Sequence, residues 1–77
     1  MTYKEKLQKT TNWKTRILII NLYHKIQVAK HSTWLLQNTA KYFGISIGQT
    51  SEAIKLAENI HLVGDCKSRK QALVRLK

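Results

Sequence analysis

The chain has 77 residues and no proline, and 14 lysines and arginines against 4 acidic residues give it a formal charge of +10. A chain of this length forms one small domain, and folding buries only about 60% of its unfolded surface. Hydrophobic residues make up 43% of the sequence, which is enough for a folded core and excludes a disordered, charge-dominated chain. A small basic domain favours a polyanionic partner, with nucleic acid first and an anionic membrane surface second.

Composition also argues against several kinds of site. The single cysteine, Cys66, has no partner for an intramolecular disulfide, which favours a reducing compartment. His24, His31 and His61 are far apart and lack neighbouring carboxylates, so we expect no metal site. A carboxylate pair, a glycine-rich phosphate loop and a Ser/His/Asp arrangement are all missing from the sequence. We therefore expect a protein that is not an enzyme and holds no cofactor.

Neither targeting nor membrane insertion is expected. Residues 1–6 are polar and charged where a signal peptide would turn apolar. The longest apolar stretch, residues 17–29, is interrupted by polar and charged residues and is shorter than the roughly 20 apolar residues that span a bilayer. The expected location is the cytoplasm.

The chain begins with a polar segment and continues into a helix. Residues 1–11 predict a flexible basic arm, at most a short helix, ahead of a single domain over residues 12–77. Asn12 is a candidate N-cap for a helix from Trp13 to Ala29. The apolar face of this helix is wide, which indicates a helix covered by other helices.

Three further helices are expected. Ser32 or Thr33 is a candidate cap for a helix that enters at Trp34 and ends at Gly44. The third helix runs from Ile47 to about Leu62, with Ser46 as its cap. The fourth runs from Arg69 to Leu76, with Ser68 as its cap. The predicted fold is therefore all-α, a small bundle of four to five helices that contains a helix-turn-helix.

The helix-turn-helix is predicted from the spacing of four residues. Ala40 is small enough for a second helix to cross close by, and Gly44 permits the positive φ of a tight turn. Ile45 fills the space between the helices, and Ser46 caps the second one. In a DNA-binding helix-turn-helix the exposed start of that second helix enters the major groove. A plain helical hairpin with a glycine cap shares the same local pattern.

Trp34 through Leu76 resembles the helix-turn-helix segment of ParB-type and phage ParB-like DNA-binding proteins. The residues that carry the resemblance are Trp34–Ala40, Phe43–Ser46, Gly48, Ser51, Ile54–Ala57 and the tail Cys66–Leu76. The family often has a basic residue where this chain has Ile47 and Glu52, and a buried valine where it has Thr50. The resemblance implies binding to double-stranded DNA, with roles as a regulator, a partition or replication accessory, or a DNA-organising factor.

Two groups of residues are candidates for DNA contact. The base-reading candidates lie at the start of the second helix of the motif, where Gln and Ser side chains suit base edges: Ser46, Ile47, Gly48, Gln49, Ser51 and Glu52. The phosphate candidates are basic or polar side chains distributed around them: Lys14, Arg16, Lys41, Lys55, Lys67, Ser68, Arg69 and Lys70.

An alternative hypothesis is a protein-interaction module of the same fold, such as a virion- or polymerase-associated subunit. Ile47 and Glu52 suit a protein surface better than a DNA groove, and a partner with an acidic surface would match the charge. The apolar face of Trp13–Ala29 is also a candidate homodimer surface.

Overall fold

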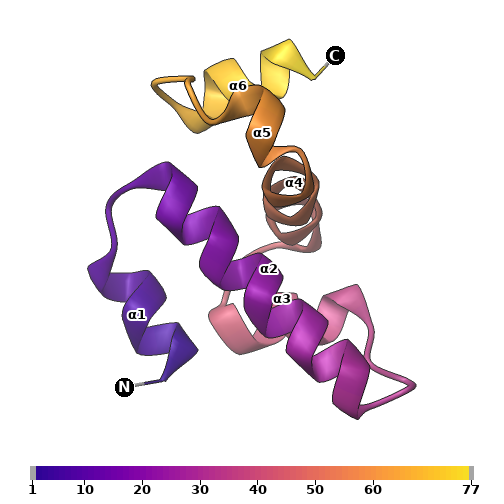
Figure 1. Ribbon diagram of the computed structural model, residues 1–77. Helices are drawn as coiled ribbons and strands as arrows, with labels where there is room; N and C mark the ends of the chain where they lie inside the picture. The colour runs from indigo at the N-terminus through magenta and orange to yellow at the C-terminus, as the bar shows by residue number, and fades with distance from the viewer. Residues whose placement is uncertain (1, 77) are drawn as a thin grey trace.

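The computed structural model describes residues 2–76, which form six helices and no strand (Figure 1). The helices are α1 (Tyr3–Lys9), α2 (Trp13–Lys30), α3 (Leu36–Phe43), α4 (Ile47–Glu58), α5 (Ile60–Val63) and α6 (Arg69–Arg75). The predicted fold class, a small all-α bundle, is confirmed.

Local side-chain chemistry fixes three helix starts where the sequence predicts them. Asn12 before α2, Ser46 before α4 and Ser68 before α6 each accept a hydrogen bond from a backbone N–H in the first helical turn. Those N–H groups have no partner within the helix, so each cap stabilises its helix by about 1 kcal/mol.

The predicted start of the second helix is wrong by two residues. Helix α3 begins at Leu36 rather than Trp34, and neither Ser32 nor Thr33 caps it. The backbone N–H of Trp34 donates to the carbonyl of His31 at 3.0 Å, which closes a turn across these residues. Ser32 and Thr33 lie inside that turn, too far ahead of the first helical N–H groups to bind them.

The predicted third helix is interrupted near its end. Helix α4 stops at Glu58 because Asn59 leaves the helical conformation, with φ −113° and ψ 24°. The side-chain amide of Asn59 donates to the carbonyl of Lys55 at 2.8 Å. One further turn, α5, follows before the chain changes direction into α6.

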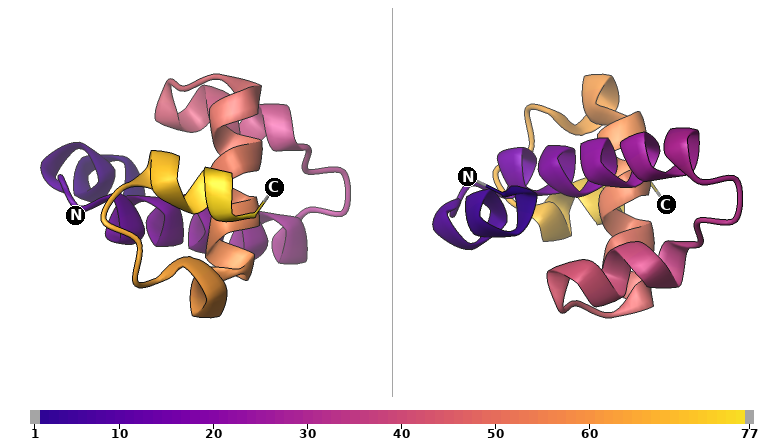
Figure 2. Two further views of the ribbon diagram at one scale, coloured as in Figure 1. Left: turned by 90° about the horizontal axis from the view of Figure 1, so that it is seen from above. Right: turned by 90° about the horizontal axis from the view of Figure 1, so that it is seen from below.

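Helix α2 is the centre of the bundle. It contacts α1, α3 and α4, and its most extensive contact is with α4, which lies across it (Figure 2). The buried hydrophobic side chains come from every helix and from the loop before α6: Leu7, Ile17, Ile20, Tyr23, Ala40, Phe43, Ala53, Leu56, Ala57, Val63, Cys66 and Ala72. This core holds α3, α4 and α6 in fixed relation to one another.

The N-terminal segment forms a docked helix. The sequence predicts a flexible arm over residues 1–11, whereas residues 3–9 form α1 and Leu7 is buried against the core. The guanidinium of Arg16 donates to the carbonyls of Leu7 at 2.7 Å and Thr10 at 2.9 Å. Tyr3 also packs edge-on against Tyr23, with ring centroids 5.6 Å apart.

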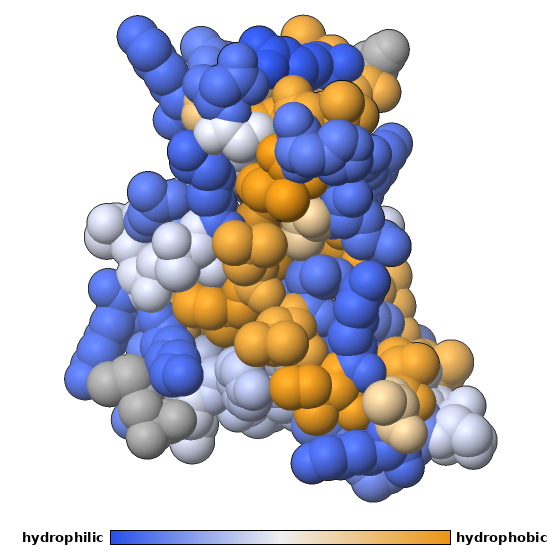
Figure 3. All heavy atoms as spheres, in the orientation of Figure 1, coloured by the Kyte–Doolittle hydropathy of each residue, from blue (hydrophilic) through white to orange (hydrophobic). Residues whose placement is uncertain are grey.

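The outer face of α2 remains uncovered, contrary to the expectation that other helices surround it. Leu18 is 43% exposed, Leu22 52% and Val28 45%. Figure 3 shows an apolar band that runs from α5 and α6 over α2, with hydrophilic side chains on both sides. No helix among residues 2–76 has the length and apolar content needed to cross a membrane.

Candidate nucleic-acid interface

A three-residue turn, Gly44–Ser46, joins α3 to α4. Gly44 adopts a φ of +71°, a left-handed conformation that residues with a Cβ adopt at a cost. The N–H of Ile45 donates to the carbonyl of Ala40 at 3.0 Å, which closes the end of α3. Ala40 is buried, and its small side chain allows α3 and α4 to pack closely.

The outward side of α4 carries Gly48, Ser51 and Lys55, spaced at i, i+3 and i+7; we call it the α4 outer face. This spacing places all three on one side of a helix. Each is exposed, and neither Ser51 nor Lys55 uses its side chain to hydrogen-bond another of the described residues. The α4 outer face is therefore free to contact another molecule.

The other base-reading candidates at the start of α4 are placed differently. The hydroxyl of Ser46 accepts from the N–H of Gln49 at 3.0 Å, and the side-chain oxygen of Gln49 accepts from the N–H of Ser46 at 3.2 Å. This reciprocal capping box engages both side chains in holding the helix start. Ile47 is 52% exposed and presents an apolar surface at the same end.

Glu52 lies on one flank of α4 and is turned toward α6. Its carboxylate oxygen Oε2 is 3.9 Å from Nη1 of Arg69, the first residue of α6. Both side chains are about half exposed, at 45% and 44%. Glu52 thus links the helix that carries the α4 outer face to the segment that carries four of the eight phosphate candidates.

The start of α6 brings four phosphate candidates together beside α4. Lys67, Arg69 and Lys70 are exposed, and Ser68 caps α6 through a bond from the N–H of Gln71 at 3.2 Å. Arg69 and Gln49 line a common cleft of about 270 Å³. The basic start of α6 therefore borders the N-terminal half of α4.

Three phosphate candidates lie elsewhere or are engaged in the fold. Lys14 Nζ donates to the carbonyl of Gly64 at 2.6 Å, and Arg16 holds α1 as described above. Lys41 is exposed on α3, in a cleft with Trp34 and residues of α2 and α3. The structure does not bring these three side chains to the α4 outer face.

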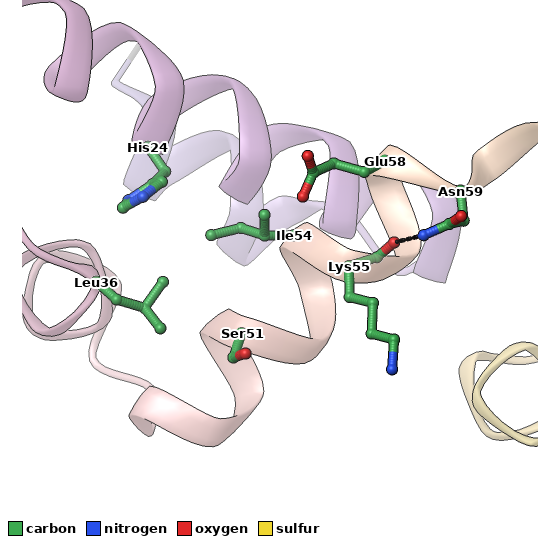
Figure 4. Close-up of a pocket in the computed structure, with 7 residues that line it drawn as sticks. All are labelled: His24, Leu36, Ser51, Ile54, Lys55, Glu58 and Asn59. Atoms are coloured by element: carbon green, nitrogen blue, oxygen red, sulfur yellow. Dashed lines mark hydrogen bonds between the residues drawn. The ribbon is translucent and has the colours of Figure 1, made fainter. Parts of the chain in front are cut away.

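On the other flank of α4 there is a cleft of about 410 Å³ between α2, α3 and α4. Figure 4 shows His24 from α2 and Leu36 from α3 on one side of it, and Ser51 and Ile54 from α4 on the other. The side chain of Lys55 extends away from His24. The cleft thus borders the α4 outer face, with an imidazole in its wall.

A buried threonine fixes this histidine. Thr39 is fully buried, and its hydroxyl accepts from the indole N–H of Trp34 at 2.8 Å and lies 2.6 Å from Nδ1 of His24. The hydroxyl proton of Thr39 then has Nδ1 as its acceptor, which assigns the imidazole proton to Nε2. Burial, and secondarily the charge of Lys25, lowers the pKa of His24 below its ordinary value of 6.5.

Neither the contact of Thr39 nor the inward position of His24 was predicted from the sequence. A signal for His24 was present, because it follows Ile17 and Ile20 at i+7 and i+4, on the face of α2 that the core covers. The hydrogen bond itself joins two helices, and no local pattern specifies such a partner.

The acidic side chains are largely neutralised within the fold. Besides Glu52, Glu58 pairs with Lys25 at 3.7 Å and Asp65 pairs with Arg75. The Arg75 hydrogen bond is the main reason that the pKa of Asp65 lies below its ordinary value. Among residues 2–76, the lysines with no ion pair include Lys55 on α4 and Lys67 and Lys70 at the start of α6.

Residues 2–76 contain no group of three His, Cys, Asp or Glu side chains placed to hold a metal ion, and Cys66 is a buried free thiol. Comparisons with protein-family models, with curated proteins and with solved structures find no match to this chain.

Proposed function

We propose that this protein is a non-enzymatic binder of double-stranded DNA, in which α3 and α4 act as a helix-turn-helix and the α4 outer face lies in the major groove. The observation that carries the proposal is the free α4 outer face beside the basic start of α6. A helix in the major groove needs exposed, unengaged side chains near its N-terminal half, and flanking cations that neutralise phosphates. Ser51 is then the best-placed base contact.

Phosphate neutralisation supplies most of the affinity in this proposal. Lys55 lies on the α4 outer face, Arg69 pairs with Glu52 of the same helix, and Lys67 and Lys70 are exposed at the start of α6. Each of these cations would contact the DNA backbone. Each such contact releases counterions, so the logarithm of the association constant should fall against the logarithm of salt concentration with a slope of about 0.9 per contact. With α4 presenting few polar side chains, sequence selectivity would be modest.

The resemblance to ParB-type and phage ParB-like proteins also suggests a cellular role for the proposed DNA binding. It favours a regulator, a partition or replication accessory, or a DNA-organising factor of phage or mobile-element type. A cytoplasmic or virion location belongs to the same proposal.

The test is a fluorescence anisotropy titration of the full chain with a short mixed-sequence duplex at several salt concentrations. Lys55→Ala should weaken binding and reduce the salt slope by about one contact. Lys41→Ala is the matched control, since it removes the same charge from a helix surface away from the α4 outer face. Equal loss from both variants, or an affinity that ignores salt, would contradict the proposal.

A second candidate function, protein interaction, is favoured by the apolar outer face of α2. Leu18 and Leu22 are exposed there, and Lys14 and Lys25 lie on the same side of the helix. Of these two lysines, Lys25 pairs with Glu58 of α4, so the face keeps a net positive charge and two copies of it would repel each other. Charge complementarity points instead to an acidic amphipathic helix of another protein as the occupant.

Methyl-resolved NMR with a synthetic Leu/Glu amphipathic helix tests this candidate. Shifts confined to Leu18 and Leu22, absent with the matching Leu/Lys peptide, would support it. A concentration-dependent dimer in sedimentation that Leu22→Lys abolishes would identify a second copy as the occupant instead, and no response to either peptide would exclude the candidate.

A further inference from the structure

The contact between Glu52 and Arg69 joins the two elements of the proposed DNA interface. Glu52 belongs to α4 and Arg69 begins α6, and the contact spans 17 residues of sequence, with Nη1 and Oε2 3.9 Å apart. Helices α4 and α6 are also in contact. The start of α6 is thus held against α4, the helix that would enter the major groove.

The position of Glu52 on α4 explains why it faces α6 rather than the groove. Glu52 follows Gly48 at i+4 and precedes Lys55 by three residues, so it lies at the edge of the α4 outer face that is nearer to α6. The carboxylate is then directed to the flank where Arg69 lies.

Among residues 2–76, Arg69 forms an ion pair with Glu52, whereas Asp65, which lines a second cleft with Arg69, pairs with Arg75. Of the polar groups that line the cleft of about 270 Å³ with Arg69, the side-chain oxygen of Gln49 is engaged with the N–H of Ser46. Arg16, also in that cleft, carries the same charge and donates to backbone carbonyls. A guanidinium has five N–H donors, and its contact with Glu52 is an ion pair at 3.9 Å, which leaves these donors available to a phosphate.

We propose that Glu52 is a positioning residue for DNA binding: it orients the guanidinium of Arg69 beside α4, so that a backbone phosphate along this flank meets an already ordered donor. The inference rests on the proposed DNA-binding function. Ordering a long side chain before binding removes part of the entropy lost in the complex.

In this role the negative charge of Glu52 strengthens DNA binding, whereas the same charge without a partner would weaken it. An unpartnered carboxylate near DNA repels phosphate, and its neutralisation tightens binding. A carboxylate that orients Arg69 has the opposite effect, since its neutralisation releases the guanidinium. If Glu52 positions Arg69, neutralising Glu52 therefore weakens DNA binding only when Arg69 is present.

A double-mutant cycle measured by anisotropy with the full chain and a short mixed-sequence duplex tests the inference. Glu52→Gln should weaken binding by about two- to fivefold, the range of a partly exposed ion pair. Arg69→Ala should weaken binding and lower the salt slope by about 0.9. In the Arg69→Ala background, Glu52→Gln should no longer weaken binding and should tighten it slightly.

Glu58→Gln is the matched control, because it neutralises a carboxylate of α4 that pairs with Lys25 instead. It should show no coupling to Arg69→Ala. Circular dichroism of every variant checks that the helices are intact. If Glu52→Gln tightens binding equally in both backgrounds, or couples no more strongly than Glu58→Gln, the inference is overturned while the DNA proposal stands. If the wild-type chain leaves the duplex unbound, the DNA proposal fails and the inference fails with it.

Discussion

Gln49 and Ser46 hold the start of α4 by two reciprocal hydrogen bonds, each from the backbone N–H of one to the side-chain oxygen of the other. Gln49 is the residue type best suited to read adenine in this helix. In the free protein, however, its amide oxygen is engaged by the cap. Its contribution to helix stability and any contribution to DNA reading must therefore be measured separately.

Two substitutions of Gln49 separate these contributions. Gln49→Ala removes the bond to Ser46 and should lower the free energy of unfolding by about 0.5–1 kcal/mol. Gln49→Glu retains an acceptor for that bond and adds a negative charge at the helix N-terminus, so stability should be equal or higher. The added charge should weaken DNA binding. Urea denaturation and anisotropy measure the two effects.

The cap interpretation is contradicted if Gln49→Ala and Gln49→Glu have the same stability. Gln8→Glu is a suitable control for the DNA measurement, since it makes the same change at an exposed position of α1, away from the α4 outer face.

The two glycines around the turn should respond in opposite directions to alanine. Gly44→Ala should destabilise the fold by about 1 kcal/mol, because a Cβ at φ +71° is strained even though nothing lies within 4 Å of it. Gly48→Ala should stabilise α4 by about 0.5 kcal/mol, because Gly48 is helical and its Cβ would meet only Ser46 Oγ at 3.8 Å. Thermal unfolding of both variants checks this, and a similar change in the two would contradict it.

Much of the fold could be predicted from the sequence because its helix boundaries are local. Asn12, Ser46 and Ser68 each cap the helix that they precede, and Gly44 ends the helix before it, through contacts a few residues apart. One of the failed predictions, the helix start at Trp34, concerns a residue with tertiary contacts: its indole binds Thr39 five residues ahead and packs on Tyr23 of α2.

The candidate site was less predictable because its residues are defined by distant partners. Lys14 and Arg16 have the sequence features of phosphate contacts, yet each donates to a backbone carbonyl of another segment. Glu52 looks unfavourable for DNA until Arg69 is seen beside it. Helical periodicity places such side chains on a face, but which other segment meets that face depends on how the helices pack.

Leu7 should anchor α1 to the bundle. It is 3% exposed, so Leu7→Ala should lower the free energy of unfolding by about 2 kcal/mol and increase amide exchange throughout α1. Leu18→Ala removes the same atoms from a side chain that is 43% exposed and should cost less than about 1 kcal/mol. If amide exchange in α1 stays unchanged in Leu7→Ala, the bonds from Arg16 alone are sufficient to dock it.

Substitution of Thr39 should lower the free energy of unfolding more than substitution of most other polar residues. Thr39→Val keeps the volume but removes the oxygen that Trp34 and His24 share, leaving an indole N–H and an imidazole nitrogen without that partner. We expect a loss of about 1–3 kcal/mol in urea denaturation. The exposed Thr33→Val should be nearly neutral, and equal losses would contradict a special role for the shared oxygen.

The same contact should make stability depend on pH. Burial, with a smaller effect from Lys25, lowers the pKa of His24 in the folded chain, whereas the unfolded chain binds the proton near the ordinary value of 6.5. Between the lowered pKa and 6.5 the unfolded state binds more protons, so stability falls as pH decreases through this window and levels off above it. Urea midpoints across the window should show this fall. His24→Asn keeps an acceptor for Thr39 without titrating and should reduce the slope; an unchanged slope would assign the pH dependence to other groups.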